Sequence, residues 1–133
     1  MYILRVATLN CQGQSGITPT KALYINDMLK RSNIDILHLQ ETYINEETFE
    51  HCSLIESNYN VVKNNAINNY GTASLVKNNL TIKELRYDTE GRIIMFEIKK
   101  FLFANIYPKS GTDTVSRQHR ENMFSTVVPN MIR

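Results

Sequence analysis

The sequence has few of the features that mark membrane, secreted or disulfide-bonded proteins. Its apolar runs are short: the longest surrounds residues 101–104, far below the ~18 residues that a membrane-spanning helix needs. Residues 1–5 lack the charged, apolar and cleavage regions of a secretory signal. Two cysteines, Cys11 and Cys52, are too few for a disulfide framework. We therefore expect a reduced protein of the nucleus or cytoplasm that is neither secreted nor bound to a membrane.

The sequence also lacks a large excess of charge of either sign. Fifteen Lys and Arg residues against 13 Asp and Glu give a formal net charge of +2, which is too small to argue for or against a nucleic-acid partner. With 42% hydrophobic and 21% charged residues the composition is that of a globular protein. A length of 133 residues fits one domain of common size.

The first forty residues predict a strand, a helix and a second strand. Residues 2–9 are apolar and β-branched and stop at Asn10. Thr18-Pro19 offers a helix N-cap followed by proline at the first helical position. The apolar residues that follow at helical spacing are Ala22, Ile25, Met28 and Leu29. Residues 34–39 form a nearly continuous apolar run, typical of a strand covered on both faces. This order predicts a right-handed crossover and a parallel pair.

The remainder of the chain predicts antiparallel strands and a final helix. Residues 42–58 are polar and irregular, with a short helical turn expected near 46–52. The expected strands are 59–63, 72–76, 80–87, 92–99 and 101–107; because the breaks between them are short, neighbours should be antiparallel. The paired asparagines at 64–65, 68–69 and 78–79 are interpreted as turn residues. The whole predicts one α/β domain with a mixed, largely antiparallel sheet and helices packed on it.

The final helix is expected at about 114–131. Its apolar spacing places four side chains inward: Val115, Met123, Val127 and Val128. Arg117, His119 and Arg120 would face outward, as a solvated face or, alternatively, as a contact to a DNA backbone. Pro129 should fray or kink the end of the helix.

Three polar residues directly follow predicted strands: Asn10, Glu41 and Tyr107. If the first two strands are parallel neighbours, Asn10 and Glu41 emerge at one edge within ~5–10 Å, since strands lie ~4.8 Å apart. A carboxylate beside a carboxamide provides the hard oxygen ligands that Mg²⁺ prefers. The alternative is that Glu41 caps a surface turn, that Asn10 satisfies its own turn and that Tyr107 is an ordinary strand aromatic.

Five motifs occur in an order that resembles a known family. They are Thr-Leu-Asn-Cys-Gln-Gly at 8–13, Asp-Ile-Leu-His-Leu-Gln-Glu-Thr at 35–42, Tyr-Gly-Thr-Ala at 70–73, Gly-Arg-Ile-Ile at 91–94 and Ala-Asn-Ile-Tyr-Pro at 104–108. Their order and spacing resemble the endonuclease/exonuclease/phosphatase family, and most of all the apurinic-type endonuclease domains of non-long-terminal-repeat retrotransposons. The resemblance implies a four-layered α/β sandwich.

The resemblance also implies an activity, a metal and partners. Family members of this kind are metal-dependent phosphodiester hydrolases, here by descent a DNA endonuclease that nicks target DNA with Mg²⁺ or Mn²⁺. Glu41 corresponds to a metal ligand, Asn10 to a residue that orients the metal shell, and Tyr107 to a residue that lies against the scissile phosphate. DNA is the implied substrate; the implied protein partners are a C-terminal half or a reverse transcriptase domain of the same polyprotein.

The sequence departs from the family in its later motifs. The Gly-Asp-Phe-Asn and Ser-Asp-His segments, which supply the base and further ligands, do not occur. Pro108-Lys109 follows Tyr107 directly, where the family usually has Ala-Pro. The resemblance therefore implies that residues 1–133 are the N-terminal portion of the domain and that the isolated chain is weak or inactive. The alternatives are a non-catalytic fragment or binding module, or a lipid phosphodiesterase of the same fold.

The remaining candidates are given structural interpretations. His38 lies in an apolar run and should be a core histidine, whereas His51 should be solvated, as should His119. No neighbouring residue would lower the pKa of Cys11, so it is not expected to be a nucleophile. Arg92 is assigned to a strand-opening turn and not to the site.

Overall fold

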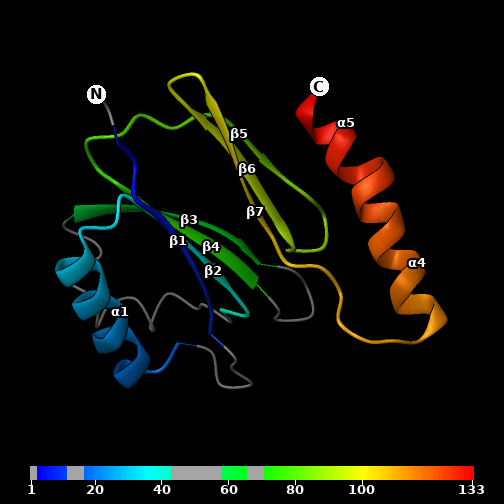
Figure 1. The fold of residues 1–133 in the computed structure, drawn as a ribbon, viewed down its shortest axis with the longest axis horizontal. Helices are drawn as coiled ribbons and strands as arrows, with labels where there is room; N and C mark the ends of the chain where they lie inside the picture. The colour runs from blue at the N-terminus through cyan, green and yellow to red at the C-terminus, as the bar shows by residue number, and fades with distance from the viewer. Residues whose placement is uncertain (1–2, 12–16, 43–57, 66–70) are drawn as a thin grey trace.

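The computed structural model describes residues 3–11, 17–42, 58–65 and 71–133. These residues form two β-sheets packed face to face, with one helix outside the first sheet and the C-terminal helices outside the second (Figure 1). The elements are β1 (Val6–Asn10), α1 (Pro19–Ser32), β2 (Ile36–Gln40), β3 (Tyr59–Asn65), β4 (Gly71–Lys77), β5 (Lys83–Tyr87), β6 (Ile93–Ile98), β7 (Phe101–Ile106), α4 (Thr114–Asn122), η1 (Met123–Val127) and α5 (Val128–Ile132). The turn expected near 46–52, with His51 and Cys52, lies outside the described residues. No helix in the described part is long and apolar enough to cross a membrane.

The first sheet has the strand order β1-β2-β4-β3. Strand β1 is parallel to β2, as predicted, and the other pairs are antiparallel. The crossover between the parallel strands is α1, which begins as predicted because the Thr18 hydroxyl accepts from the backbone N–H of Lys21 at 3.2 Å. The apolar stripe of α1 is buried against the outer face of this sheet.

The second sheet has the order β5-β6-β7 and is antiparallel throughout. Its central strand β6 is buried on both faces, because its side chains alternate between two apolar clusters. Ile94, Phe96 and Ile98 pack between the two sheets. Ile93 and Met95 pack beneath the C-terminal helices, around Met123. Strand β7 lies against β2 and β4 of the first sheet.

The predicted fold class is confirmed, with two local differences. The strands expected in one sheet divide between two, since the apolar pattern of a strand does not identify its partner. Asn64 and Asn65, expected in a turn, belong to β3. The Asn64 amide has partners outside β3: its Nδ2 donates to Asp88 Oδ1 at 2.8 Å and to the Ile93 carbonyl at 2.9 Å.

The C-terminal helix differs most from its prediction. A π-helical turn, η1, separates α4 from α5. Because a π turn changes the helical phase, one 3.6-residue period cannot place both ends correctly: Met123 is buried as predicted, but Val115 is 65% exposed. His119, predicted to be solvated, is partly exposed, with 23% of its side chain accessible, and its Nε2 lies 2.9 Å from Glu90 Oε2. Arg120, predicted outward, donates to the carbonyls of residues 109 and 111.

Candidate active site

Asn10 and Glu41 emerge at the same edge of the first sheet. The parallel register of β1 and β2 pairs Asn10 with Gln40, and the backbone N–H of Cys11 donates to the Gln40 carbonyl at 2.8 Å. Asn10 therefore lies beside the residue that precedes Glu41, and its side chain is exposed. The predicted juxtaposition of these two residues is confirmed.

Glu41 has a left-handed backbone, with φ of 52°. A non-glycine residue in this region costs about 1–3 kcal/mol, and such residues cluster at functional sites. The conformation is fixed by the next residue, because the N–H of Thr42 donates to the Gly71 carbonyl and the Thr42 carbonyl accepts from Ile17, each at 3.1 Å. The chain thus turns as soon as β2 ends.

Tyr107 approaches Glu41 from the other sheet. Its phenolic hydroxyl donates to Glu41 Oε1, although 66 residues separate the two in sequence. Tyr107 directly follows β7 and Glu41 directly follows β2, so the contact bridges the two sheets where these strands end. The structure therefore brings all three predicted site residues to one region of the molecule.

Arg92 contacts both the backbone and the ring of Tyr107. The N–H of Tyr107 donates to the Arg92 carbonyl at 2.8 Å, and Arg92 Nη1 donates to the Tyr107 carbonyl at 3.1 Å. The guanidinium carbon lies 5.5 Å from the centroid of the Tyr107 ring, within the range of a cation–π interaction. Asp88 fixes the turn before β6, because its Oδ1 accepts from the N–H groups of Arg92 and Ile93 at 2.9 Å each. Sequence reasoning left Arg92 out of the site.

Two further side chains missed by sequence reasoning are Gln40 and Asn105. Asn105 is 1% exposed and accepts from Gln40 Nε2 at 2.9 Å. A signal for Asn105 was present: it occupies the same face of β7 as Phe103, which packs between the sheets, so a polar residue shares its face with a core aromatic. A buried amide in such a position requires polar partners.

Cys11 and His38 lie near the site in the neutral form. Burial raises the pKa of the Cys11 thiol to about 11, so it is not a thiolate at neutral pH. Burial lowers the pKa of His38 to about 4, and its Nδ1 lies 2.8 Å from the Ser74 hydroxyl. Both residues have the structural roles that the sequence predicted.

The site residues fit a hard divalent cation as a partial ligand set. Glu41 offers a carboxylate and Asn10 a carboxamide oxygen, which are the donor types that Mg²⁺ accepts. Mg²⁺ is commonly bound by one or two carboxylates, with waters and substrate phosphates completing the shell. Within the described residues, no group of three or more His, Cys, Asp or Glu side chains could hold a metal ion.

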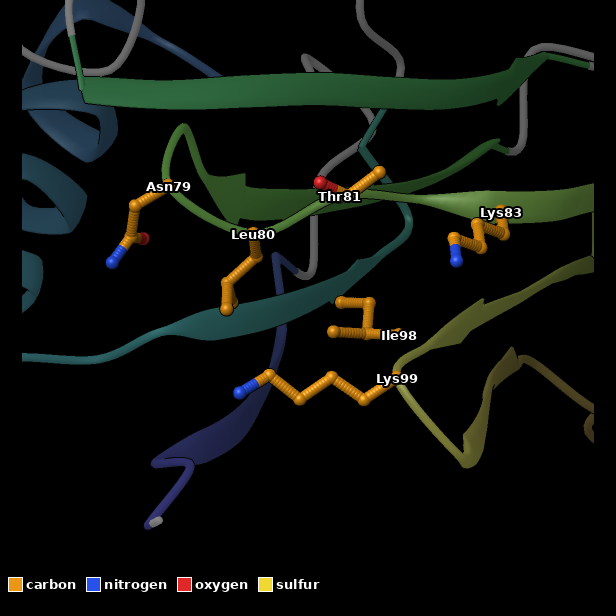
Figure 2. A pocket seen from close by; sticks show the side chains of 6 residues that line it. All are labelled: Asn79, Leu80, Thr81, Lys83, Ile98 and Lys99. Carbon is orange, nitrogen blue, oxygen red and sulfur yellow. The ribbon is translucent and has the colours of Figure 1, made fainter.

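Two hollows lie at opposite ends of the strands. One, of about 260 Å³, adjoins the candidate site and is lined by Leu9, Asn10, Cys11, Lys21, Tyr24 and Ile25. The other, of about 320 Å³, lies where β6 ends at Ile98 (Figure 2). Tyr107 contacts the residue before β6 begins, so this second hollow is at the far end of that strand. It is lined by Asn79, Leu80, Thr81, Lys83, Ile98 and Lys99.

No protein-family model matches the chain, and no curated protein matches it in sequence. Solved structures do match. TDP2 from Caenorhabditis elegans gives a TM-score of 0.73 at 20% identity, over 97% of this chain and 42% of that one. An AP endonuclease from Archaeoglobus fulgidus gives 0.68 at 20% identity, over 89% of this chain and 47% of that one. The 3′ phosphatase NExo from Neisseria, bound to a product DNA hairpin, gives 0.73 at 17% identity, over 98% and 54%.

These likenesses define the fold class. The chain has the α/β sandwich fold of TDP2 and the AP endonucleases, which is the fold that the motif resemblance implied. Identities of about 20% show a shared fold and no more, since one fold supports many activities. The chain spans about half the length of the solved structures it matches.

Proposed function

We propose that this chain is the N-terminal portion of a divalent-metal-dependent phosphodiester hydrolase that acts on DNA. The observation that carries the proposal is the meeting of Glu41 and Tyr107 across the two sheets, beside Asn10. The neighbours support DNA as the substrate, since one is bound to a DNA hairpin and others are AP endonucleases. Membership of a retrotransposon polyprotein, with a reverse transcriptase domain as partner, rests on the motif resemblance alone.

Each residue has a proposed task in the reaction. A Mg²⁺ or Mn²⁺ ion would neutralise the negative charge that develops on the phosphate, and Glu41 with Asn10 would hold it. Tyr107 donates a hydrogen bond from its hydroxyl to the Glu41 carboxylate, which orients that carboxylate. Arg92 keeps a positive charge beside the Tyr107 ring, where an anionic substrate would be attracted. None of these four residues is proposed to act as the general base.

The open edges of the sheets support the incompleteness of the domain. Among the described residues, no strand pairs with the outer edge of β1 or β7. Because β7 lies over β2 and β4, β1 extends beyond it, and Val6 and Thr8 on its inner face are exposed. Phe101 on β7 is 62% exposed. A further strand beside β7 would cover these side chains. The longer solved structures have additional polypeptide that could supply such a strand.

The first test is metal-dependent nicking of supercoiled plasmid by the purified chain. Without a general base the rate should fall ~10²–10⁴-fold below that of a complete site, so we expect little or no nicking with Mg²⁺. Mn²⁺ should still bind, and Glu41→Ala should weaken that binding by at least ~10-fold. Glu97→Ala is the matched control, since it removes a carboxylate from β6, where its partner is Arg86.

Each outcome of this test has a distinct meaning. Glu41-dependent nicking by the chain alone would support the proposed hydrolase activity but contradict the proposal that the domain is incomplete. Absence of Glu41-dependent Mn²⁺ binding would contradict the hydrolase and favour a non-catalytic binding module. Cleavage of a phospholipid in place of DNA would favour the lipid phosphodiesterase alternative. An in-frame Gly-Asp-Phe-Asn and Ser-Asp-His in the downstream coding DNA would support the proposal.

The open edges also predict self-association of the isolated chain. Unpaired edge strands with exposed apolar side chains pair with other chains, so light scattering should rise with protein concentration. Phe101→Lys should lower this association several-fold because a charged edge opposes strand pairing. Phe124→Lys is the matched control, since Phe124 is 51% exposed but lies on η1. Equal effects of both variants would contradict association through the strand edges.

A further inference from the structure

Asn105 joins the two sheets two residues before Tyr107. Its Nδ2 donates to the Ala73 carbonyl at 2.9 Å and to the Leu39 carbonyl at 3.1 Å. These carbonyls belong to one register pair of β2 and β4, so one amide from the second sheet is bonded to two strands of the first. Ser74 Oγ, at 3.3 Å, is a further acceptor.

The same network reaches β1. Gln40 Nε2 donates to Asn105 Oδ1 and to Thr8 Oγ1, both at 2.9 Å. The Thr8 hydroxyl in turn donates to Gln40 Oε1 at 3.2 Å. Thr8, Gln40 and Asn105, which we call the polar layer, thus connect the three strands that carry Asn10, Glu41 and Tyr107.

The polar layer has a regular relation to the site. Thr8, Leu39 and Asn105 each precede a site residue by two positions: Asn10, Glu41 and Tyr107. Two residues of a strand span about 6–7 Å and return to the same face. Thr8, the Leu39 carbonyl and Asn105 therefore lie one side-chain step below a site residue on the same chain segment, and Gln40 directly precedes Glu41.

We propose that Asn105 is the positioning residue that sets where Glu41 and Tyr107 meet. Apolar contacts between the sheets are not directional, so they tolerate small sliding of one sheet over the other. The Asn105 amide has directional donors and an acceptor, and all of them are satisfied in one alignment. The consequence for metal binding rests on the proposed function; the consequence for the Glu41–Tyr107 contact does not.

Asn64 offers a matched control for a purely structural role. Its amide also joins the sheets, from β3 to Asp88 and Ile93 of the second sheet. Strand β3 is at the opposite end of the first sheet from β1 and carries none of the proposed site residues. Asn64 reaches Tyr107 indirectly, through Asp88 and Arg92, so Asn64→Ala should destabilise the fold and move the site much less than Asn105→Ala does.

The test uses 3-fluorotyrosine at position 107 and ¹⁹F NMR of the whole chain. Glu41→Ala gives the resonance of a tyrosine that has lost its carboxylate partner. Asn105→Ala should move the parent resonance toward that position, and Asn64→Ala should move it much less. An unchanged resonance in folded Asn105→Ala, or an equal change in Asn64→Ala, overturns the proposal.

A second variant and a second measurement complete the test. If Asn105→Ala does not fold, Gln40→Ala replaces it, because Gln40 is only half-buried and its loss should be tolerated. This variant removes the donor to Asn105 Oδ1 and should move the resonance in the same direction. No movement in Gln40→Ala then overturns the proposal. By Mn²⁺ titration, Asn105→Ala should weaken binding ~10–100-fold, as loss of a supporting residue does, and Asn64→Ala less than twofold. If the parent binds no Mn²⁺, the proposed function fails and the ¹⁹F result alone decides the positioning role.

Discussion

Replacing Phe96 by alanine is expected to lower the free energy of unfolding by about 3–5 kcal/mol. Phe96 is fully buried between the two sheets, with its ring 5.9 Å from that of Phe103 and 6.0 Å from that of His38. Removing the ring loses its transfer free energy and leaves a cavity that β6, fixed on both faces, cannot collapse to fill. Urea unfolding followed by circular dichroism would measure the loss.

Phe101→Ala is the matched control for this prediction. It removes the same side chain from the neighbouring strand, but Phe101 is 62% exposed, so the unfolding free energy should change by less than about 0.5 kcal/mol. A similar loss in both variants would mean that the core between the sheets does not determine stability. Because the Glu41–Tyr107 contact spans those sheets, the core also determines whether the site can form.

Acidification is expected to remove about 3 kcal/mol of stability through His38 alone. Burial lowers the pKa of His38 from 6.5 to about 4 in the folded protein, so the unfolded chain binds a proton more readily. The stabilisation is fully present above pH 6.5 and is lost as the pH falls from 6.5 to 4. The difference between the two pKa values sets the size of the effect.

His38→Gln isolates this contribution, because glutamine does not titrate. All other titrating groups are common to both forms, so the change in unfolding free energy between pH 7 and pH 4 should be compared for the two proteins. The parent should lose about 3 kcal/mol more than His38→Gln over that interval. Parallel pH profiles of the two proteins would contradict a buried, neutral His38.

The sequence predicted those elements whose signals are local. The cap at Thr18 and the apolar stripe after it identified α1, and the continuous apolar run identified β2. The division into two sheets was not predicted from the apolar pattern, because the pattern of β6 shows burial on both faces but not which strands cover it. The C-terminal helix failed at Val115, since the π turn at η1 has no periodic signal of its own.

The candidate site was predicted in position but not in its supporting contacts. Asn10, Glu41 and Tyr107 were found because each follows a strand, and the parallel pairing of β1 with β2 was sufficient to bring the first two together. Arg92 and Asn105 were missed because their partners are distant in sequence: the Asn105 amide bonds residues 32 and 66 positions away. Such pairings depend on how the two sheets face each other.

The left-handed backbone at Glu41 has a consequence for how this position could change over evolutionary time. Glycine would relieve the conformational cost and keep the turn, and asparagine would tolerate it better than glutamate does. Drift without selection on the side chain would therefore favour those two residues. A glutamate retained in descendants of this gene would indicate selection for the carboxylate. Glycine at this position would indicate that the fold persists without selection for catalysis.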